Sequence, residues 1–362
     1  MKRVLSFTLA LALCLALFGC SGQESSSSSA VSSETGTSSQ ESQPESQVSS
    51  QASGLSSASS AVSEEPVPVG TAVVAALKGP TAMGMVKMMS DDAALDSPKY
   101  ASADEITPKL VQGELDIAAV PANLASVLYN NTEGQVQVLA INTLGVLYIV
   151  ENGDTVQSVE DLKGKTIFAS GKGSTPEYAL NYMLSQNGID PETDVTIEWK
   201  SEHSECVAAL ASTENAIAML PQPFVTTAQT QNENLRVALD MTEEWEKLAS
   251  ANGGDATLIT GVVVARKDFV KENPDLINLF LAGYEQSVAY TETDLEGAAA
   301  LVGQYDIVPE AVALKALPEC NITFIAGEEM KTKLSAYLQT LQEQNPKSIG
   351  GELPGDDFYY VG

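Results

Sequence analysis

The sequence predicts an α/β protein of two lobes, each a parallel β-sheet covered by helices, with a ligand cleft between them. Three observations predict this fold class. Apolar runs of strand length alternate with helical segments through the folded region, which extends from about Val67 to Gly362. The order of these segments is duplicated, with matching turn sequences in both copies. The region holds about 300 residues, which favours two domains over one.

The two copies begin with the same three elements: a buried strand, a Lys-Gly-x-Thr turn and a helix. The first copy has a valine-rich strand and places the elements at 71–77, 78–81 and 82–89. The second copy places them at 165–170, 172–175 and 177–186, with Pro176 at a favourable first-turn position of the helix. One match of four residues can arise by chance, so the rest of each copy decides whether the unit is duplicated.

Each copy continues with a helix, a strand that ends in Ile-Ala-x-x-Pro, a further helix and a further strand. In the first copy these lie at 104–112, 116–121, 123–129 and 136–142. In the second copy they lie at 204–212, 216–221, 223–229 and 235–240. Two matched motifs in the same order indicate a duplicated unit. Alternating strands and helices favour parallel sheets with helices on both faces, and the duplication favours two of them.

The matched turns predict where a ligand binds. In an open parallel sheet, ligands lie outside the carboxyl ends of the strands, where both Lys-Gly-x-Thr turns and both proline turns fall. Helices that begin after Thr81 and Thr175 would direct free backbone N–H groups at a carboxylate, sulfonate, phosphate or other acceptor-rich ligand. Alternatively, these glycines and threonines are ordinary turn and cap residues. As a facing pair, we interpret the turns as ligand contacts. They lack the spacing of a Walker A loop.

The N-terminus predicts export and a lipid anchor. Lys2 and Arg3 precede an apolar stretch, 4–18, that is too short for a comfortable membrane span. The following Leu17-Phe18-Gly19-Cys20 resembles a bacterial lipobox, in which cleavage leaves an acylated cysteine as the first residue. We therefore expect a signal peptide at 1–19 and a lipid on Cys20 that holds the chain at the extracytoplasmic face of the cell membrane. The alternative is an ordinary secretory signal with an incidental cysteine.

A serine-rich segment follows the expected anchor. Serine makes up 20 of the 45 residues from Ser21 to Glu65, which include no lysine, arginine or aromatic residue. Such a segment has nothing to bury and cannot offset the entropy of ordering its chain, so we expect 20–66 to be a disordered tether. A flexible coil of this length spans roughly 35 to 40 Å root-mean-square, which lifts a folded domain clear of the lipid surface.

Composition excludes several functions. Loss of the first 19 residues removes Lys2 and Arg3 and changes the formal net charge from −29 to −31, so the surface should repel nucleic acid. Beyond Cys20, the remaining cysteines are Cys206 and Cys320, and His203 is the single histidine. No Cys/His group has metal-ligand spacing, and a catalytic triad would depend on that one histidine. We therefore expect no catalytic residues, no cofactor and no metal ion.

Five segments together resemble one family. They are Leu77-Lys78-Gly79-Pro80-Thr81, Leu115-Asp116-Ile117-Ala118, Val159-Glu160-Asp161-Leu162-Lys163-Gly164-Lys165, Met219-Leu220-Pro221-Gln222-Pro223 and Val263 to Phe269 with Glu272-Asn273-Pro274. The chain is similar to extracytoplasmic solute-binding proteins of ABC importers with the type-2 periplasmic-binding-protein fold. The group it resembles most includes the nitrate, sulfonate, taurine and thiamine-precursor receptors.

The resemblance implies the domain boundaries. The Asp-Leu-Lys-Gly-Lys stretch marks the crossing into the second lobe, and Arg266-Lys267-Asp268-Phe269 marks the return. Lobe one is then 67–154 plus 258–362, lobe two is 155–257, and a two-strand hinge lies near 150–156 and 255–261. Gly253, Gly254 and Gly261 could absorb the rotation of closure. Cys206 and Cys320 fall on different lobes, so we expect both to be reduced.

The resemblance also implies the function. Closure of two lobes would capture a small organic or anionic solute, and the monomeric receptor would deliver it to an ABC permease driven by a cytoplasmic ATPase. One alternative is a ligand-sensing lipoprotein that signals to a membrane partner. Another is an enzyme similar to the thiamine-pyrimidine synthases, but those carry a run of cysteines that is missing here.

By position in the family, the expected ligand contacts come from both lobes. They are Thr81, Ala82, Met83, Gly84, Pro121, Ala122, Asn123, Asn142 and Thr143 from lobe one, and Gly173, Ser174, Thr175, Pro176, Gln222 and Pro223 from lobe two. Asn123, Ser174 and Gln222 are the best polar candidates. No arginine falls at these turns, which argues against a doubly charged anion. His203 also falls at the cleft edge, where we interpret it as a surface or structural histidine.

Overall fold

The computed structural model describes residues 71–91, 95–100, 103–251 and 257–362. These residues belong to one compact unit, Glu64–Gly362. The expected signal peptide, Cys20, the serine-rich tether, Gly253 and Gly254 lie outside the described residues. Within the described ranges, no helix is both long enough and apolar enough to cross a membrane.

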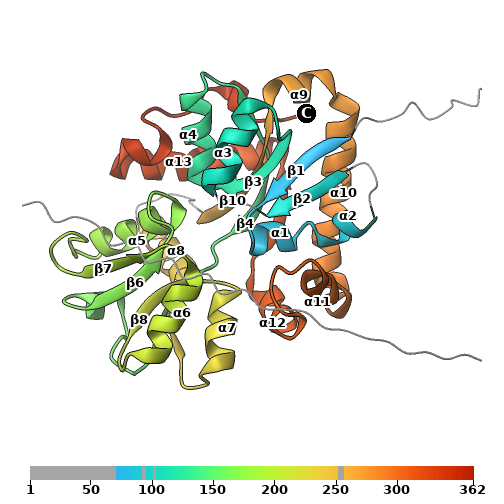
Figure 1. The fold of residues 1–362 in the computed structure, drawn as a ribbon. Coiled ribbons are helices and arrows are strands. Elements are labelled where there is room, and N and C mark those ends of the chain that lie inside the picture. Colours follow the sequence, from blue (N-terminus) through green and yellow to red (C-terminus); the bar gives the residue numbers. More distant parts are fainter. Residues whose placement is uncertain (1–70, 92–94, 101–102, 252–256) are drawn as a thin grey trace, which may run out of the picture. The chain divides into compact units, whose positions relative to one another are not determined.

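The first lobe is built on a six-stranded sheet in the order β11-β4-β10-β3-β1-β2 (Figure 1). Strand β1 pairs in parallel with β2 and β3, whereas β10 runs antiparallel to both of its neighbours, β3 and β4. The strands are β1 (Ala72–Ala76), β2 (Leu95–Tyr100), β3 (Ile117–Pro121), β4 (Val136–Leu144), β10 (Ile259–Arg266) and β11 (Ile322–Ala326).

The second lobe is built on a five-stranded sheet in the order β7-β6-β8-β5-β9. Strand β6 pairs in parallel with β7 and β8, and β5 runs antiparallel to β8 and β9. The strands are β5 (Leu147–Glu151), β6 (Thr166–Ser170), β7 (Thr196–Lys200), β8 (Ile217–Pro221) and β9 (Arg236–Asp240).

The two sheets have the same topology, which confirms the predicted two-lobe α/β fold. The order β4-β10-β3-β1-β2 of the first sheet corresponds to β9-β5-β8-β6-β7 of the second. At the edge of the first sheet, β11 runs antiparallel to β4. The sheets are mixed rather than wholly parallel, because β10 and β5 also run antiparallel inside them. These strands are the two that follow the passages between sheets: β5 comes after β4, and β10 comes after β9 and the helix that follows it.

Helices cover both faces of the first sheet. On β10, Val262 and Val264 belong to one core cluster and Val263 and Ala265 to another, as the alternation of side chains along a strand requires. Burial on both faces explains the continuous apolar run in this strand. The helices of this lobe are α1 (Pro80–Met83), α2 (Val86–Asp91), α3 (Ala103–Gln112), α4 (Ala122–Asn131), α9 (Lys267–Glu272), α10 (Pro274–Thr293), α11 (Leu295–Gln304), α12 (Glu310–Ala316) and α13 (Gly327–Gln344).

Helices also surround the second sheet, and four short 3₁₀ turns complete the described fold. The helices are α5 (Thr175–Gln186), α6 (His203–Ser212), α7 (Phe224–Gln231) and α8 (Met241–Ala251). The 3₁₀ turns are η1 (Val159–Leu162), η2 (Leu317–Glu319), η3 (Pro346–Ile349) and η4 (Asp356–Phe358).

One predicted helix is divided. The segment 82–89 forms the end of α1 and most of α2, with a turn at Gly84 and Met85 between them. A Cβ atom on Gly84 would lie 2.9 Å from the Cγ2 atom of Ile322 and 3.3 Å from the hydroxyl of Tyr284. The chain therefore packs against β11 and α10 at this point more closely than a helix with side chains allows.

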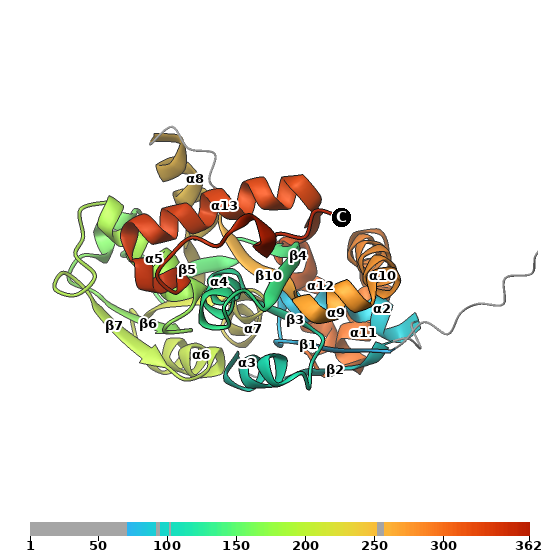
Figure 2. The same ribbon diagram turned by 90° about the horizontal axis from the view of Figure 1, so that it is seen from above.

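The two lobes share apolar contacts outside the sheets. Helix α13 of the first lobe passes α8 of the second in Figure 2. The ring centroid of Tyr337 on α13 lies 5.6 Å from that of Trp245 on α8. Trp245 also packs on Tyr182 of α5, at 4.5 Å between centroids. All three side chains belong to the largest core cluster, which includes residues of both sheets.

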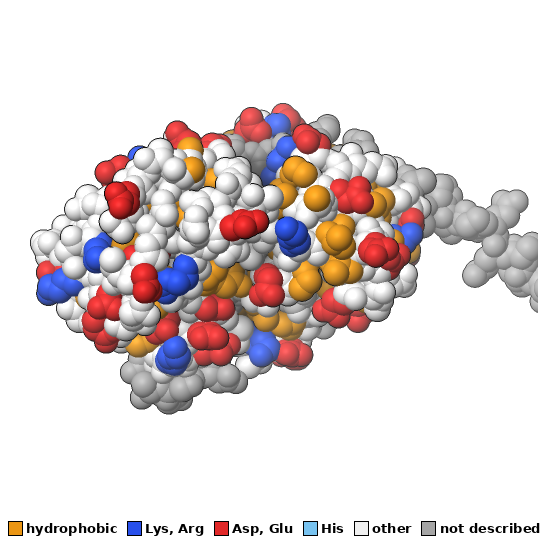
Figure 3. All heavy atoms as spheres, turned by 90° about the horizontal axis from the view of Figure 1, so that it is seen from below, with side chains coloured by type: hydrophobic (Ala, Val, Ile, Leu, Met, Phe, Trp, Pro, Cys, Tyr) orange, Lys and Arg blue, Asp and Glu red, His pale blue; other side chains and the backbone are white. Residues whose placement is uncertain are grey.

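The surface is acidic. Figure 3 shows Asp and Glu side chains spread over one face, with fewer Lys and Arg side chains among them and apolar side chains in patches. The sequence has 48 acidic residues and 19 basic ones, so this distribution follows from its composition.

Candidate functional site

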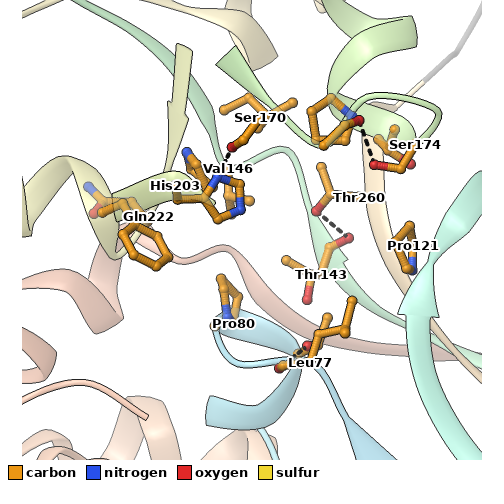
Figure 4. A pocket seen from close by; sticks show the side chains of 18 of the residues that line it. Leu77, Pro80, Pro121, Thr143, Val146, Ser170, Ser174, His203, Gln222 and Thr260 are labelled. Atoms are coloured by element: carbon orange, nitrogen blue, oxygen red, sulfur yellow. Dashed lines mark hydrogen bonds between the residues drawn. The ribbon is translucent and has the colours of Figure 1, made fainter. Parts of the chain in front are cut away.

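A cavity of about 280 Å³ lies where the carboxyl ends of parallel strands from both sheets meet (Figure 4). Its walls come from the segments that follow β1, β3, β6, β7 and β8, as expected for ligand sites in open α/β sheets. The volume is close to the lower end of the range for small-molecule pockets, about 300 Å³. The lining consists of Leu77, Lys78, Gly79, Pro80, Thr81, Pro121, Thr143, Val146, Leu147, Ser170, Gly171, Ser174, Thr175, Pro176, Ser201, Glu202, His203, Pro221, Gln222, Phe224 and Thr260.

Hydroxyl groups supply much of the polar lining, and several already donate to the backbone. Thr81 Oγ1 donates to Leu77 O at 2.8 Å, and Ser174 Oγ donates to Gly171 O at 2.8 Å. Thr260 Oγ1 donates to Leu144 O at 2.5 Å. Each hydroxyl has one hydrogen, so toward a ligand these three present oxygen lone pairs rather than donors.

Charge is scarce in the cavity wall. Among the lining residues that the structure describes, Lys78 and Glu202 are charged and none is an arginine. Lys78 Nζ donates to Asp306 O at 2.8 Å and to its Oδ2 at 3.3 Å. The positive charge of Lys78 is thus already balanced by a carboxylate, and the wall offers little net attraction to a highly charged anion.

His203 stands between the strand ends of the second lobe. Its Nδ1 lies 2.5 Å from Ser170 Oγ, and its ring centroid lies 4.9 Å from that of Phe224. Burial lowers the pKa of His203 to about 4, because a charged imidazolium would lose its hydration there. The ring is therefore neutral at physiological pH.

The residue expected to be the best polar contact on lobe one, Asn123, joins the lobes instead of lining the cavity. Its side chain is 1% exposed. Asn123 Nδ2 donates to Ser348 O at 3.0 Å, and its Oδ1 accepts from Thr175 Oγ1 at 3.2 Å. The amide therefore connects α4 to the first residue of α5, directly beside the cavity.

The fifteen expected ligand contacts divide by position. Seven line the cavity: Thr81, Pro121, Thr143, Ser174, Thr175, Pro176 and Gln222. Seven others are buried and do not line the cavity: Ala82, Met83, Gly84, Ala122, Asn123, Asn142 and Pro223. Gly173 is exposed and also outside the lining. Apart from Asn142, which lies within β4, the buried set belongs to helices that follow the turns or lies beside their ends, where the chain packs on the core.

Several lining residues carried no usable signal in the sequence. Three of them lie on or beside β5 and β10, namely Val146, Leu147 and Thr260. The local sequence pattern does not reveal which position each of these two strands takes in its sheet. Phe224 is the first residue of α7, and the sequence around it does not distinguish it from a core residue. Ser170 could have been found, because it is the last residue of a predicted strand of the second copy.

The helix N-termini offer less to an anion than the sequence suggested. Helix α1 has four residues, too few for a useful dipole. In the Lys-Gly-x-Thr turn of the second lobe, Gly173 N donates to Glu177 Oε2 at 2.5 Å. A carboxylate of the chain itself therefore occupies the start of α5. An acceptor-rich ligand must use side-chain donors.

Two α/β lobes with a cavity at the carboxyl ends of both sheets define a two-lobe binding protein of the type-2 periplasmic class. Solved structures agree with this fold. An ABC transporter protein from Parabacteroides distasonis is 20% identical, covers 80% of this chain and 98% of its own, and has a TM-score of 0.67. The aliphatic sulphonate binding protein SsuA from Escherichia coli is 17% identical, with 81% and 92% covered and a TM-score of 0.62. The alkanesulfonate-binding protein SsuA from Xanthomonas axonopodis pv. citri, bound to MOPS, is 16% identical, with 81% and 96% covered and a TM-score of 0.60.

The family follows from the sequence match. The model for the ABC transporter, phosphonate, periplasmic substrate-binding protein family matches residues 99–301, more than half of the chain. No curated protein matches the sequence. The chain belongs to this family, and it is the extracytoplasmic substrate-binding component of an ABC importer that binds small solutes.

Proposed function

We propose that the solute is a small organic molecule with an acceptor-rich group of at most one negative charge and an apolar body. The observation that carries this proposal is the lining itself, which offers a neutral imidazole but no arginine among its described residues, while most of its hydroxyls already donate within the protein. A singly charged acceptor gains from a neutral donor without needing a cation to replace its hydration.

The apolar part of the lining supports an apolar ligand body. Leu77, Pro80, Val146, Leu147 and Phe224 line the same cavity as the hydroxyls. Binding sites of this kind bury most of the ligand against apolar side chains and use a few polar groups to orient it. An alkanesulfonate has both features, and two of the structurally similar proteins carry that ligand class in their names.

Capture occurs by closure of the lobes. We assign lobe one to 67–144 plus 258–362 and lobe two to 147–257, with the hinge near 144–147 and 255–261. The first boundary lies before the expected residue 154, because β5 (Leu147–Glu151) pairs with β8 and β9 in the second sheet. A solute in the cavity touches segments of both sheets, so it can favour the closed state over the open one. A solute that touched one lobe alone could not do so through those contacts.

Delivery completes the function. A lipid on Cys20 and the serine-rich segment 20–66 keep the monomeric receptor near an ABC permease driven by a cytoplasmic ATPase. The receptor releases the solute unchanged, so it acts as a binding protein and not as an enzyme. Replacing Cys20 by alanine should move the protein from the membrane fraction to the soluble fraction, and a lipidated N-terminal cysteine should disappear from its mass spectrum.

Isothermal titration calorimetry tests the solute class with three matched probes. We compare 1-propanesulfonate, propylphosphonate and the neutral methyl propyl sulfone in alkaline buffer, where the phosphonate carries two charges. The monoanion should bind at one site and about tenfold or more tighter than the dianion, which corresponds to about 1.4 kcal/mol. Tighter binding of the dianion, or binding of none of the three, would contradict the proposed class.

A further inference from the structure

His203 is the single histidine of the sequence, and two side chains on other elements fix its ring. The residue begins α6, directly after β7, while Ser170 ends β6 and Phe224 begins α7. Ser170 Oγ lies 2.5 Å from Nδ1, and Phe224 packs against the ring. Figure 4 shows the second ring nitrogen pointing away from Ser170 into the cavity, toward the side of Thr260 and Thr143.

We infer that Ser170 holds His203 in the tautomer with its hydrogen on Nε2, and that this N–H donor selects solutes that present an acceptor at that point of the cavity. The second part of this inference rests on the proposed solute site, whereas the first part concerns the protein without a ligand. Ser170 is a positioning residue, because it acts on the solute through the imidazole.

The direction of the Ser170–His203 hydrogen bond follows from the environment of the hydroxyl. Ser170 is 2% exposed, so its hydrogen needs an acceptor within the protein. His203 Nδ1 is a strong acceptor at hydrogen-bond distance. The neighbouring Cys206 is a poor alternative, because burial raises the pKa of its thiol to about 11 and a neutral thiol accepts weakly; the Ser170 hydroxyl opposes that shift only in part. Ser170 therefore donates to Nδ1, which leaves the imidazole hydrogen on Nε2.

The charged groups around the ring do not make it a cation. On α6, Glu205 Oε2 accepts from the backbone N–H groups of Ser201 and Glu202, and Glu202 caps the same helix start. On β7, Lys200 Nζ pairs with Glu198 at 3.0 Å. On the first lobe, Lys78 is paired with Asp306.

The remaining neighbours of the ring, Ser170 on β6 and Phe224 on α7, are uncharged. Within the described residues, no ion pair joins the ring to a carboxylate. The imidazole thus presents one neutral donor to the cavity.

A neutral Nε2–H donor selects by hydrogen bonding and not by charge. A sulfonate, sulfone or carboxylate oxygen at this point would accept the hydrogen. A ligand with an ammonium or amide N–H at the same point would place its donor against the Nε2–H of His203 and leave both donors without an acceptor. Sites with buried polar groups strongly reject ligands that leave those groups unpaired. The opposite tautomer would have the opposite preference.

Nitrogen NMR tests the tautomer directly. The protein is purified without a polyhistidine tag and labelled with ¹⁵N-histidine, so its spectrum holds one pair of imidazole nitrogens. We expect a protonated Nε2 and an unprotonated Nδ1 with no change from neutral pH to about pH 5. Ser170→Ala should give a mixture of tautomers, and Ser170→Thr should restore the wild-type pattern. A protonated Nδ1 in the wild type, or an unchanged spectrum in Ser170→Ala, would overturn the inference.

Binding of 1-propanesulfonate tests the selection. His203→Phe keeps an aromatic ring but removes the donor, and it should weaken binding by about 10- to 100-fold, as for loss of a hydrogen bond to a charged group. His203→Gln places an amide N–H near the position of Nε2 and should recover most of that loss. Thermal unfolding confirms that each variant is folded. If His203→Phe binds as tightly as the wild type, the selective role is wrong.

The two experiments separate this inference from the proposed function. If the wild type binds none of the sulfonate, sulfone and phosphonate probes, the proposed solute class fails and the selection step fails with it, while the nitrogen spectrum still decides the tautomer. If the wild type binds the sulfonate and His203→Phe does too, the solute class stands and the inference about His203 falls.

Discussion

Glu151 is the most buried charged residue that the structure describes. It ends β5, and its carboxylate is fully buried, 2.6 Å from Arg236 Nη2. The carboxylate also accepts from the amide and hydroxyl of Thr155 and from the amide of Val156. Burial acts to raise the pKa of Glu151, but these donors together hold it below its ordinary value. The residue therefore fixes the loop 152–156 to the second sheet.

Replacing Glu151 by glutamine should destabilise the protein in a pH-dependent way. Removing one partner of a buried ion pair costs about 3 to 5 kcal/mol. Because the folded-state pKa of Glu151 is lowered, its contribution is complete above the unfolded-state pKa, near 4.5, and is lost as the pH falls through the folded-state value. Urea unfolding at neutral and acidic pH should show the difference from wild type shrink below about pH 4.5. Glu246→Gln, on the exposed side of α8, is the control. A pH-independent difference would contradict this role.

At this scale the sequence predicted backbone positions better than side-chain roles. The turn residues Thr81, Ser174 and Gln222 line the cavity, because the carboxyl end of a parallel strand can be recognised from the strand itself. The roles of Asn123 and His203 depended on partners far along the chain. Asn123 bonds to Ser348, and the ring of His203 packs on Phe224, contacts that no local pattern encodes.

Among the elements, the link between β4 and β5 is the most constrained. It consists of Gly145 and Val146, and it carries the chain from one sheet to the other. A Cβ atom on Gly145 would lie 2.1 Å from Thr242 Oγ1, at the start of α8. Helix α8 is the last helix before the return to β10, so the first crossing packs against the element that leads into the second. A glycine is needed here for space, not for an unusual backbone angle.

Gly145→Ala should therefore destabilise the protein by about 1 to 3 kcal/mol, as for overpacking of a tight contact. The matched control is Gly283→Ala within α10, where the nearest atom to the new Cβ is the flexible Met88 Sδ at 3.3 Å. The same substitution there should be neutral or stabilising by up to about 1 kcal/mol, because alanine favours helix. Chemical denaturation of both variants measures the difference. Equal effects would show that the crossing is not tightly packed.

The sequence predicted nearly all elements of the duplicated unit but not the direction of the crossing strands. The family resemblance marked the return to lobe one at Arg266-Lys267-Asp268-Phe269, and β10 occupies Ile259–Arg266. Its antiparallel pairing with β3 and β4 follows from the path of the chain between lobes, which hydrophobic periodicity does not record. The break at Gly84 was missed for a similar reason, since it depends on Tyr284 and Ile322, some 200 residues away.

For the whole molecule, the net charge is the dominant electrostatic property. A formal charge of −29 surrounds a cavity that is proposed to receive an anion, so the long-range field opposes the ligand it binds. Screening by salt weakens interactions beyond about 10 Å at 0.1 M ionic strength and leaves short hydrogen bonds in the cavity largely intact. Salt should therefore assist the approach of the solute.

Stopped-flow fluorescence tests this expectation. The chain has two tryptophans, so Trp199→Phe leaves Trp245, which packs between lobes on Tyr337, as the sole reporter. The association rate of 1-propanesulfonate should rise with ionic strength, while that of the neutral methyl propyl sulfone should stay constant. A rate that falls with salt for the sulfonate would mean that a local positive field, absent from the described lining, guides the ligand.

The central claim is that the cavity between the two sheets holds the solute, and calorimetry of one variant tests it most directly. Ser174 lines the cavity at the start of α5, and Ser174→Phe would fill part of its volume of about 280 Å³. Ser212→Phe, at the exposed end of α6, is the control for an added aromatic ring. With 1-propanesulfonate, the control should bind as the wild type does, and Ser174→Phe should bind at least about 100-fold more weakly, a loss of about 2.8 kcal/mol. Unchanged affinity in a folded Ser174→Phe protein would place the solute elsewhere and contradict the account.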